Sequence, residues 1–137
     1  MMDSQIRKNG WLNTAGWIEL VYGAGECVDT LYLFFIQAQI LPNFYPTMNF
    51  AEINNLLVKH PLYLAAVFAF FALGRLTAGI GVLHNRLWGF WLSLFISLVT
   101  VIWAVFMLPL AGADMLGCLI IVILLLIGRF GQKPIIQ

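Results

Sequence analysis

Residues Gly16–Leu41 read GWIELVYGAGECVDTLYLFFIQAQIL and are followed by Pro42. A helix needs about 20 predominantly apolar residues to cross the hydrocarbon core of a bilayer, and this run is long enough. Proline ends the run, because a proline inside a helix removes a backbone hydrogen bond. A second run, Pro61–Leu83, reads PLYLAAVFAFFALGRLTAGIGVL and begins with a residue suited to a first helical turn. The two runs predict two membrane-spanning helices.

Two further apolar runs, Leu87–Leu108 and Gly112–Gly128, predict a third and a fourth span. The short polar turn His84–Arg86 joins the second and third spans as an antiparallel hairpin, and a short turn after Pro109 makes the third and fourth spans neighbours. The sequence therefore predicts an all-α fold. We expect residues 1–137 to form a single domain, an up-down bundle of four transmembrane helices.

The connection between the first two spans is longer and less apolar than the other two. Asn49 and Glu52 have the spacing of a helix N-cap and the residue that reaches back to it. Residues Phe50–Val58 are then either a short amphipathic helix on the membrane surface or an irregular loop.

The composition favours lipid as the solvent around this fold. Of the 137 residues, 62% are hydrophobic and 9% are charged, whereas a soluble domain averages about 25% charged residues. The net charge of +1 argues against a nucleic-acid partner, which would need a basic face. Cys27 and Cys118 belong to no CxxC motif and no Cys/His cluster, so we expect buried free thiols, no metal site and no cofactor.

The distribution of basic residues predicts the orientation in the membrane. Four spans place both termini and the second turn on one side, which carries Arg7, Lys8, Arg86, Arg129 and Lys133. The other side carries only Lys59. Basic residues near span ends favour the cytoplasmic face. We expect a multi-pass protein of the cytoplasmic (inner) membrane with both termini in the cytoplasm.

Two charged residues lie near the middle of apolar runs, Glu26 in the first and Arg75 in the second. A charge at that depth costs at least about 2.5–3.5 kcal/mol, so it is usually paired or functional. Because the two spans run in opposite directions, both residues reach about the same depth. Arginine presents a fork of donors that matches a carboxylate. We predict an ion pair of Arg75 with Glu26 or with Asp29, either structural or part of a proton relay or substrate site.

Polar residues of the first span share one helical face. These residues are Glu19, Tyr22, Glu26 and Asp29, and their spacing of i, i+3, i+7 and i+10 is that of one side of a helix. Such a face should point into the bundle or toward a partner protein, because lipid cannot solvate it. A helix that starts near Gly16 places Glu19 roughly one turn into the membrane and Glu26 near the midplane.

The second and third spans add small and hydroxyl-bearing residues. Ser93, Ser97 and Thr100 share a face of the third span, with Ser97 near the depth of Glu26. These hydroxyls either bond carbonyls of their own helix and hold helices together or line a polar cavity. Close helix packing is predicted from the small residues Gly74, Ala78 and Gly81. Asp114, in the first turn of the fourth span, suits the positive end of the helix dipole.

The hairpin sequence Gly74–Leu92 reads GRLTAGIGVLHNRLWGFWL. A Gly-rich helix that ends in a short basic turn and leads into a Trp-containing helix resembles the hairpin of small uncharacterised prokaryotic four-span membrane proteins. The likeness extends over the second and third spans, about half of the chain. It implies a fold and a membrane location, and it implies no activity.

Three functions fit these observations. The first is an accessory or interaction subunit of a larger membrane complex, whose partners are lipids and either other transmembrane subunits or copies of itself. The second is a small oligomeric transporter or channel coupled to protons or cations, with Glu26 as the exchanging site, Arg75 as its charge partner and Ser97 as a polar lining residue. The third is an intramembrane enzyme that uses the carboxylate and the arginine for acid–base chemistry.

Overall fold

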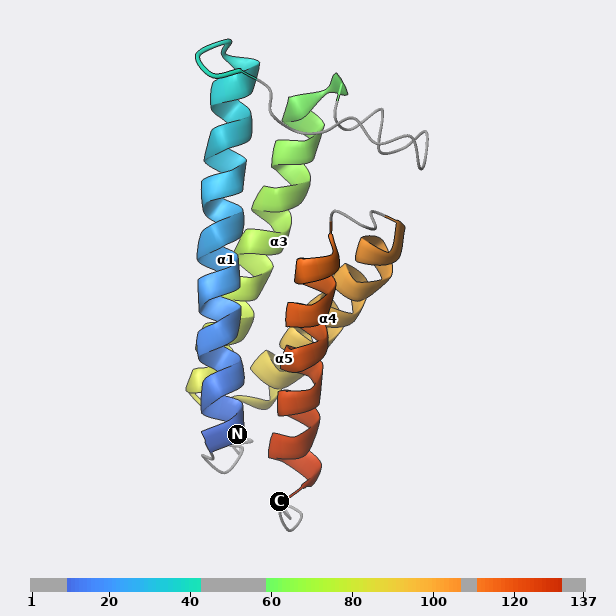
Figure 1. Cartoon of the computed structure of the whole chain (residues 1–137). Helices are drawn as coiled ribbons and strands as arrows, with labels where there is room; N and C mark the ends of the chain where they lie inside the picture. The colour runs from blue at the N-terminus through green and yellow to red at the C-terminus, as the bar shows by residue number, and fades with distance from the viewer. Residues whose placement is uncertain (1–9, 43–58, 107–110, 132–137) are drawn as a thin grey trace.

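The computed structural model describes residues 10–42, 59–106 and 111–131. These ranges contain four helices, α1 (Gly10–Gln37), α3 (Pro61–Leu83), α4 (Leu87–Phe106) and α5 (Gly112–Phe130). Successive helices run in opposite directions, so α1 begins and α5 ends at the same end of the molecule (Figure 1). Neighbour contacts join α1 to α3, α3 to α4, α4 to α5 and α5 back to α1. The predicted all-helical fold is confirmed, whereas the predicted surface helix Phe50–Val58 lies outside the described residues.

Three of the described helices, α3, α4 and α5, are long and apolar enough to cross a membrane. Helix α1 is not one of them, although its 28 residues span about 42 Å at 1.5 Å per residue. The carboxylates of Glu19, Glu26 and Asp29 lower its mean hydropathy. Length and apolar composition thus give three candidate spans, and α1 differs from them by its acidic residues.

The predicted bounds of the first helix were wrong at both ends. Helix α1 begins at Gly10 rather than Gly16, because Leu12 and Ala15 are buried against the other helices. It ends at Gln37 rather than at the residue before Pro42. The cause is Gln39, whose φ of 59° lies in the left-handed region and turns the chain out of the helix.

The predicted hairpin between α3 and α4 is confirmed and is unusually close. Asn85 has a φ of 55°, and the Arg86 amide donates to the Gly81 carbonyl at 2.8 Å. A Cβ atom added to Gly89 would lie 2.5 Å from the Gly81 Cα atom. The two helices therefore meet backbone to backbone through a pair of glycines, of which the sequence singled out only Gly81.

Helix α3 also packs closely against α1 through glycines of both helices. A Cβ atom added to Gly79 would lie 3.0 Å from the Gly16 carbonyl oxygen, and one added to Gly23 would lie 2.9 Å from Leu76. Of the predicted packing residues, Ala78 is fully buried and Gly74 faces Ile96 of α4. Small residues on both faces of α3 allow it to approach two neighbours at once.

The apolar interior is divided into two clusters at opposite ends of the bundle. The termini-side core comprises Leu12, Ala15, Val82, Phe90, Ile121 and Leu125. The far-side core, between α1 and α3, comprises Leu33, Ile36, Leu64 and Ala65. All four helices contribute to the termini-side core, and the polar residues described below lie between the two clusters.

Candidate functional site

A completely buried arginine, Arg75 of α3, is the centre of a polar cluster. Its Nε donates to Glu26 Oε1 at 2.8 Å, and its Nη1 donates to Glu19 Oε2 at 3.0 Å. Both acids belong to α1, so two ion pairs join this helix to α3. The predicted pairing of Arg75 with Glu26 is confirmed. Asp29 makes no ion pair with Arg75, and the second ion-pair partner of Arg75 is Glu19.

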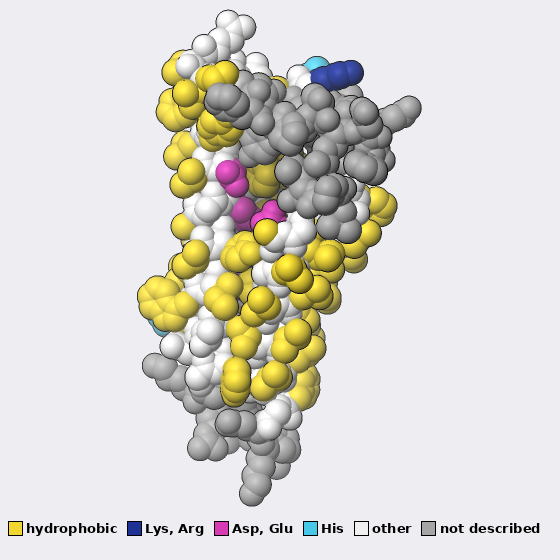
Figure 2. Space-filling view, viewed as in Figure 1, with side chains coloured by type: hydrophobic (Ala, Val, Ile, Leu, Met, Phe, Trp, Pro, Cys, Tyr) yellow, Lys and Arg dark blue, Asp and Glu magenta, His cyan; other side chains and the backbone are white. Residues whose placement is uncertain are grey.

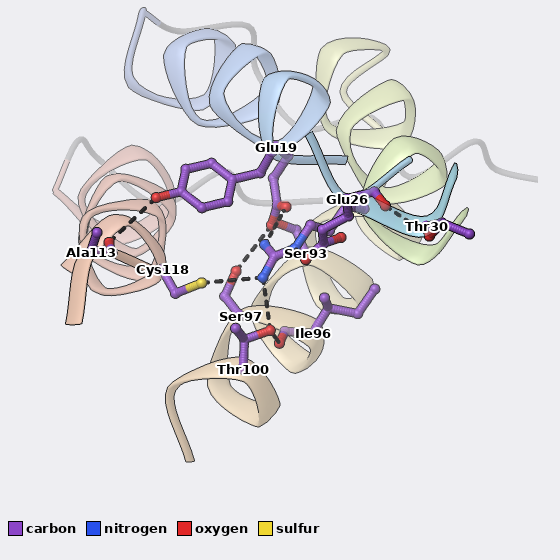
Figure 3. Close-up of polar contacts among 11 residues, drawn as sticks. Glu19, Glu26, Thr30, Ser93, Ile96, Ser97, Thr100, Ala113 and Cys118 are labelled. Carbon is purple, nitrogen blue, oxygen red and sulfur yellow. Dashed lines mark hydrogen bonds and ion pairs between the residues drawn. The ribbon is translucent and has the colours of Figure 1, made fainter. Parts of the chain in front are cut away.

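The remaining nitrogen of the guanidinium connects Arg75 to the other two helices. Its Nη2 donates to Thr100 Oγ1 of α4 at 2.7 Å and to Cys118 Sγ of α5 at 3.2 Å. The Tyr22 ring lies 5.4 Å from the guanidinium carbon, within the range of a cation–π contact. From α3, Arg75 thus contacts side chains of the three other described helices. Figure 3 labels four of its partners, Glu19, Glu26, Thr100 and Cys118. Cys118 is a buried free thiol, as predicted, but it also accepts a hydrogen bond.

Glu19 is the best-satisfied acid of the cluster. Its Oε1 accepts hydrogen bonds from Ser93 Oγ at 2.5 Å and from Ser97 Oγ at 3.0 Å, while its Oε2 pairs with Arg75. Helix α1 begins six residues earlier than expected. Nine residues of helix precede Glu19, which places it about 14 Å from the helix start.

The serines of α4 therefore face a carboxylate, whereas Thr100 also bonds the Ile96 carbonyl of its own helix at 2.9 Å.

We expect Ser93→Ala to lower the free energy of unfolding by about 1–3 kcal/mol, since it removes a donor from a buried acceptor. Thermal or denaturant unfolding in detergent measures this loss. Thr77→Val is the control, because the Thr77 hydroxyl bonds the Leu73 carbonyl of its own helix on an exposed face. Equal stability of the Ser93 variant and this control would contradict the assigned contact.

Glu26 differs from Glu19 in the number of its partners. Its carboxylate accepts one side-chain hydrogen bond, from Arg75, and its Oε2 is buried without a hydrogen-bond partner among the described residues. Its side chain keeps 14% of its surface exposed, whereas that of Glu19 keeps none. One guanidinium thus faces two carboxylates. If the cluster binds a proton, Glu26 is the acid that can take it with the smaller loss of hydrogen bonding.

Glu26 also lines a cavity of about 330 Å³. Acidic side chains from α1 and α5, those of Asp29 and Asp114, line the same cavity. Figure 2 shows acidic side chains at the surface of a hollow beside α1, near the end where α5 begins. Most of the other lining side chains are apolar or aromatic and include Tyr22, Leu64, Val67, Phe68, Phe71 and Trp103.

The position of the cavity along the bundle is well defined. It is lined by the first half of α3, the end of α4 and the start of α5, so it lies in the half of the molecule away from the chain termini. The termini-side core lies at the other end. Asp114 is in the first turn of α5, as predicted, and it contributes its charge to the cavity. Sequence reasoning did not identify the aromatic walls, because no periodic pattern brings residues of three helices together.

Among the residues that the structure describes, no group of three or more His, Cys, Asp or Glu side chains could hold a metal ion. Comparisons with protein-family models, with curated proteins and with solved structures returned no match. The resemblance of the α3–α4 hairpin to small prokaryotic membrane proteins stays a prediction. The case for a function therefore depends on the cluster and the cavity.

Proposed function

We propose that this chain is a small membrane transporter that exchanges a cation for a proton at Glu26. In this proposal α1 is a fourth span, held in the membrane by its ion pairs with Arg75, and both termini are cytoplasmic. The proposal depends on one observation. Glu26 lines a cavity of about 330 Å³, and one of its carboxylate oxygens is buried without a hydrogen-bond partner in the described part of the chain.

The charge balance of the cluster supports this role. Glu19 accepts three hydrogen bonds and offsets the charge of Arg75 with full hydrogen bonding. Glu26 is the additional acid, and a buried charge that lacks full hydrogen bonding favours the uptake of a proton or a cation. Arg75 keeps this acid in place through its Nε while Glu26 changes its protonation state.

The distribution of apolar residues supports exchange rather than free conduction. The cavity lies in the half of the bundle away from the termini, and the termini-side core separates it from the opposite end. A packed apolar layer is a barrier to ions, because burying a charge without partners is costly. Transport in this arrangement requires the helices to rearrange, as they would in an alternating-access carrier.

Proteoliposomes that contain a pH-sensitive dye test the proposal. Gradients of sodium, potassium and quaternary ammonium salts are imposed one at a time, and proton movement is recorded. We expect at least one gradient to drive proton flux with the native chain. Glu26→Gln should reduce this flux to that of empty liposomes, because the amide cannot exchange a proton. Thr77→Val, outside the cavity, should retain it.

Correct folding of Glu26→Gln is checked by its elution volume and its thermal midpoint in detergent. Unchanged proton flux in Glu26→Gln would contradict the proposal. The absence of proton flux with the native chain under every gradient would also contradict it. In the second case the accessory-subunit function would become the better explanation. That function predicts that mild detergent extracts the chain together with other membrane proteins at a fixed ratio.

The accessory-subunit function stands as the second candidate because apolar side chains cover the outer faces of the helices. Examples with more than half of their surface exposed are Phe70, Leu73 and Phe95. Another transmembrane protein can pack against such faces as well as lipid can. Glu19 and Arg75, in contrast, are satisfied within one chain and offer no polar group to a partner.

A further inference from the structure

The size of the cavity constrains what it can bind. A volume of about 330 Å³ is roughly ten times the share of one water in liquid, about 30 Å³. It falls at the lower end of the range for small-molecule sites, about 300–1,000 Å³. A bare inorganic ion would leave most of this space empty or filled with water. The volume suits an organic molecule of moderate size.

The charges around the cavity favour a positively charged occupant. Asp29, Asp114 and Glu26 all line it, and the only basic residue in the described lining is Arg75. The Arg75 side chain has no exposed surface, and it donates to two carboxylates, a hydroxyl and a thiol. It therefore offers nothing to an anion in the cavity. Asp29 and Asp114 line the same cavity with like charges, and a cation between them would relieve their repulsion.

The walls favour an occupant with an apolar body. Aromatic rings of α3 and α4, those of Phe68, Phe71 and Trp103, line the cavity together with Leu64 and Val67. Aromatic faces attract organic cations, and tryptophan attracts them best. A strongly hydrated inorganic ion would gain little from such walls.

We propose that the cavity binds a monovalent organic cation of the ammonium class. Its charged head lies between Asp29 of α1 and Asp114 of α5, and its apolar body packs against Phe68, Phe71 and Trp103. This assignment rests on the transport function proposed above and names the class of cation that is exchanged. It depends on Asp29 and Asp114, whereas proton exchange depends on Glu26, so the two parts can fail separately.

Binding to the intact chain in nanodiscs of zwitterionic lipid tests the assignment without any need for transport. Isothermal titration calorimetry with benzyltrimethylammonium is the measurement, and sodium chloride and benzenesulfonate are the matched inorganic cation and aromatic anion. We expect saturable binding of the organic cation only. The double variant Asp29→Asn/Asp114→Asn should weaken it by at least about tenfold, which corresponds to 1.4 kcal/mol.

Two tryptophan variants test the walls separately. Trp103→Leu should weaken binding by about tenfold, because it removes an aromatic surface against which the apolar body of the ligand packs. Trp17→Leu is the matched control, because Trp17 is exposed on α1 and does not line the cavity. Thermal midpoints of all variants without ligand show whether each one is folded.

The outcomes separate the two proposals. If the organic cation binds only when both aspartates are present and no proton flux is seen, the result supports this assignment and contradicts the transport function. Proton flux that depends on Glu26 and is driven only by inorganic cations would overturn the assignment and keep the transport function. Benzyltrimethylammonium binding that is absent, or equal in native chain and double variant, would also overturn it.

Discussion

Replacing Arg75 by leucine is expected to lower the free energy of unfolding by about 3–5 kcal/mol. The variant leaves Glu19 and Glu26 buried without their counter-charge, and it removes the donor to Thr100 and Cys118. An uncompensated buried charge costs more than the ion pair contributes. Thermal or denaturant unfolding in detergent, followed by circular dichroism, measures the loss.

A double-mutant cycle distinguishes the ion pairs from simple loss of packing. Glu19→Gln in the Arg75→Leu background should recover part of the stability, because the amide removes the unpaired charge and still accepts from Ser93 and Ser97. Glu26→Gln should recover less, since Glu26 is partly exposed and can take up a proton instead. Arg129→Leu is the matched control. It should lower the free energy of unfolding by about 0.5–2 kcal/mol, because the Arg129 guanidinium lies over aromatic rings. Strictly additive effects in the cycle would mean that Arg75 and the acids do not interact.

Gly89→Ala is expected to destabilise the α3–α4 hairpin by about 1–3 kcal/mol, although it adds a single methyl group. The new carbon would lie 2.5 Å from the Gly81 Cα atom and 2.6 Å from the Val82 amide nitrogen. These are backbone atoms, so no rotation of a side chain can relieve the overlap. The two helices must move apart, which also shifts Ser93 and Thr100 relative to the polar cluster.

Gly25→Ala is the matched control, because nothing lies within 4 Å of a Cβ atom at that position. Alanine stabilises a helix interior by up to about 1 kcal/mol relative to glycine, so this variant should be neutral or more stable than the native chain. The difference in thermal midpoint between the two variants isolates the close helix contact from helix propensity. A Gly89 variant as stable as the Gly25 variant would show that the hairpin is looser than described.

The fold and the centre of the site could be predicted from the sequence because both depend on hydropathy along single helices. Apolar runs identified the helices, and their opposite directions brought Glu26 and Arg75 to the same depth. The start of α1 was misplaced, since the polar residues Asn13 and Thr14 hid its first turns. Inside that helix the Thr14 hydroxyl bonds the Gly10 carbonyl, which a hydropathy pattern does not reveal.

The cavity and the second role of Cys118 could not be predicted from the sequence for a different reason. They depend on how far α5 extends along α1 and on which side of α4 faces Arg75. Such distances result from glycine contacts between helices, at Gly89 of α4 and at Gly117 and Gly128 of α5, rather than from any periodicity within one helix. The sequence offered one usable signal, the alignment of Ser93, Ser97 and Thr100 on the face that the cluster occupies.

The two ion pairs have a consequence for the order of events during synthesis. The acids of α1 leave the ribosome 49 and 56 residues before the arginine that neutralises them. A nascent chain that ends before α3 exposes an acidic helix to lipid with no counter-charge, so α1 should not stay inserted on its own. If α1 is a span, as proposed above, its stable insertion should be a late step that follows the arrival of the α3 segment at the translocon.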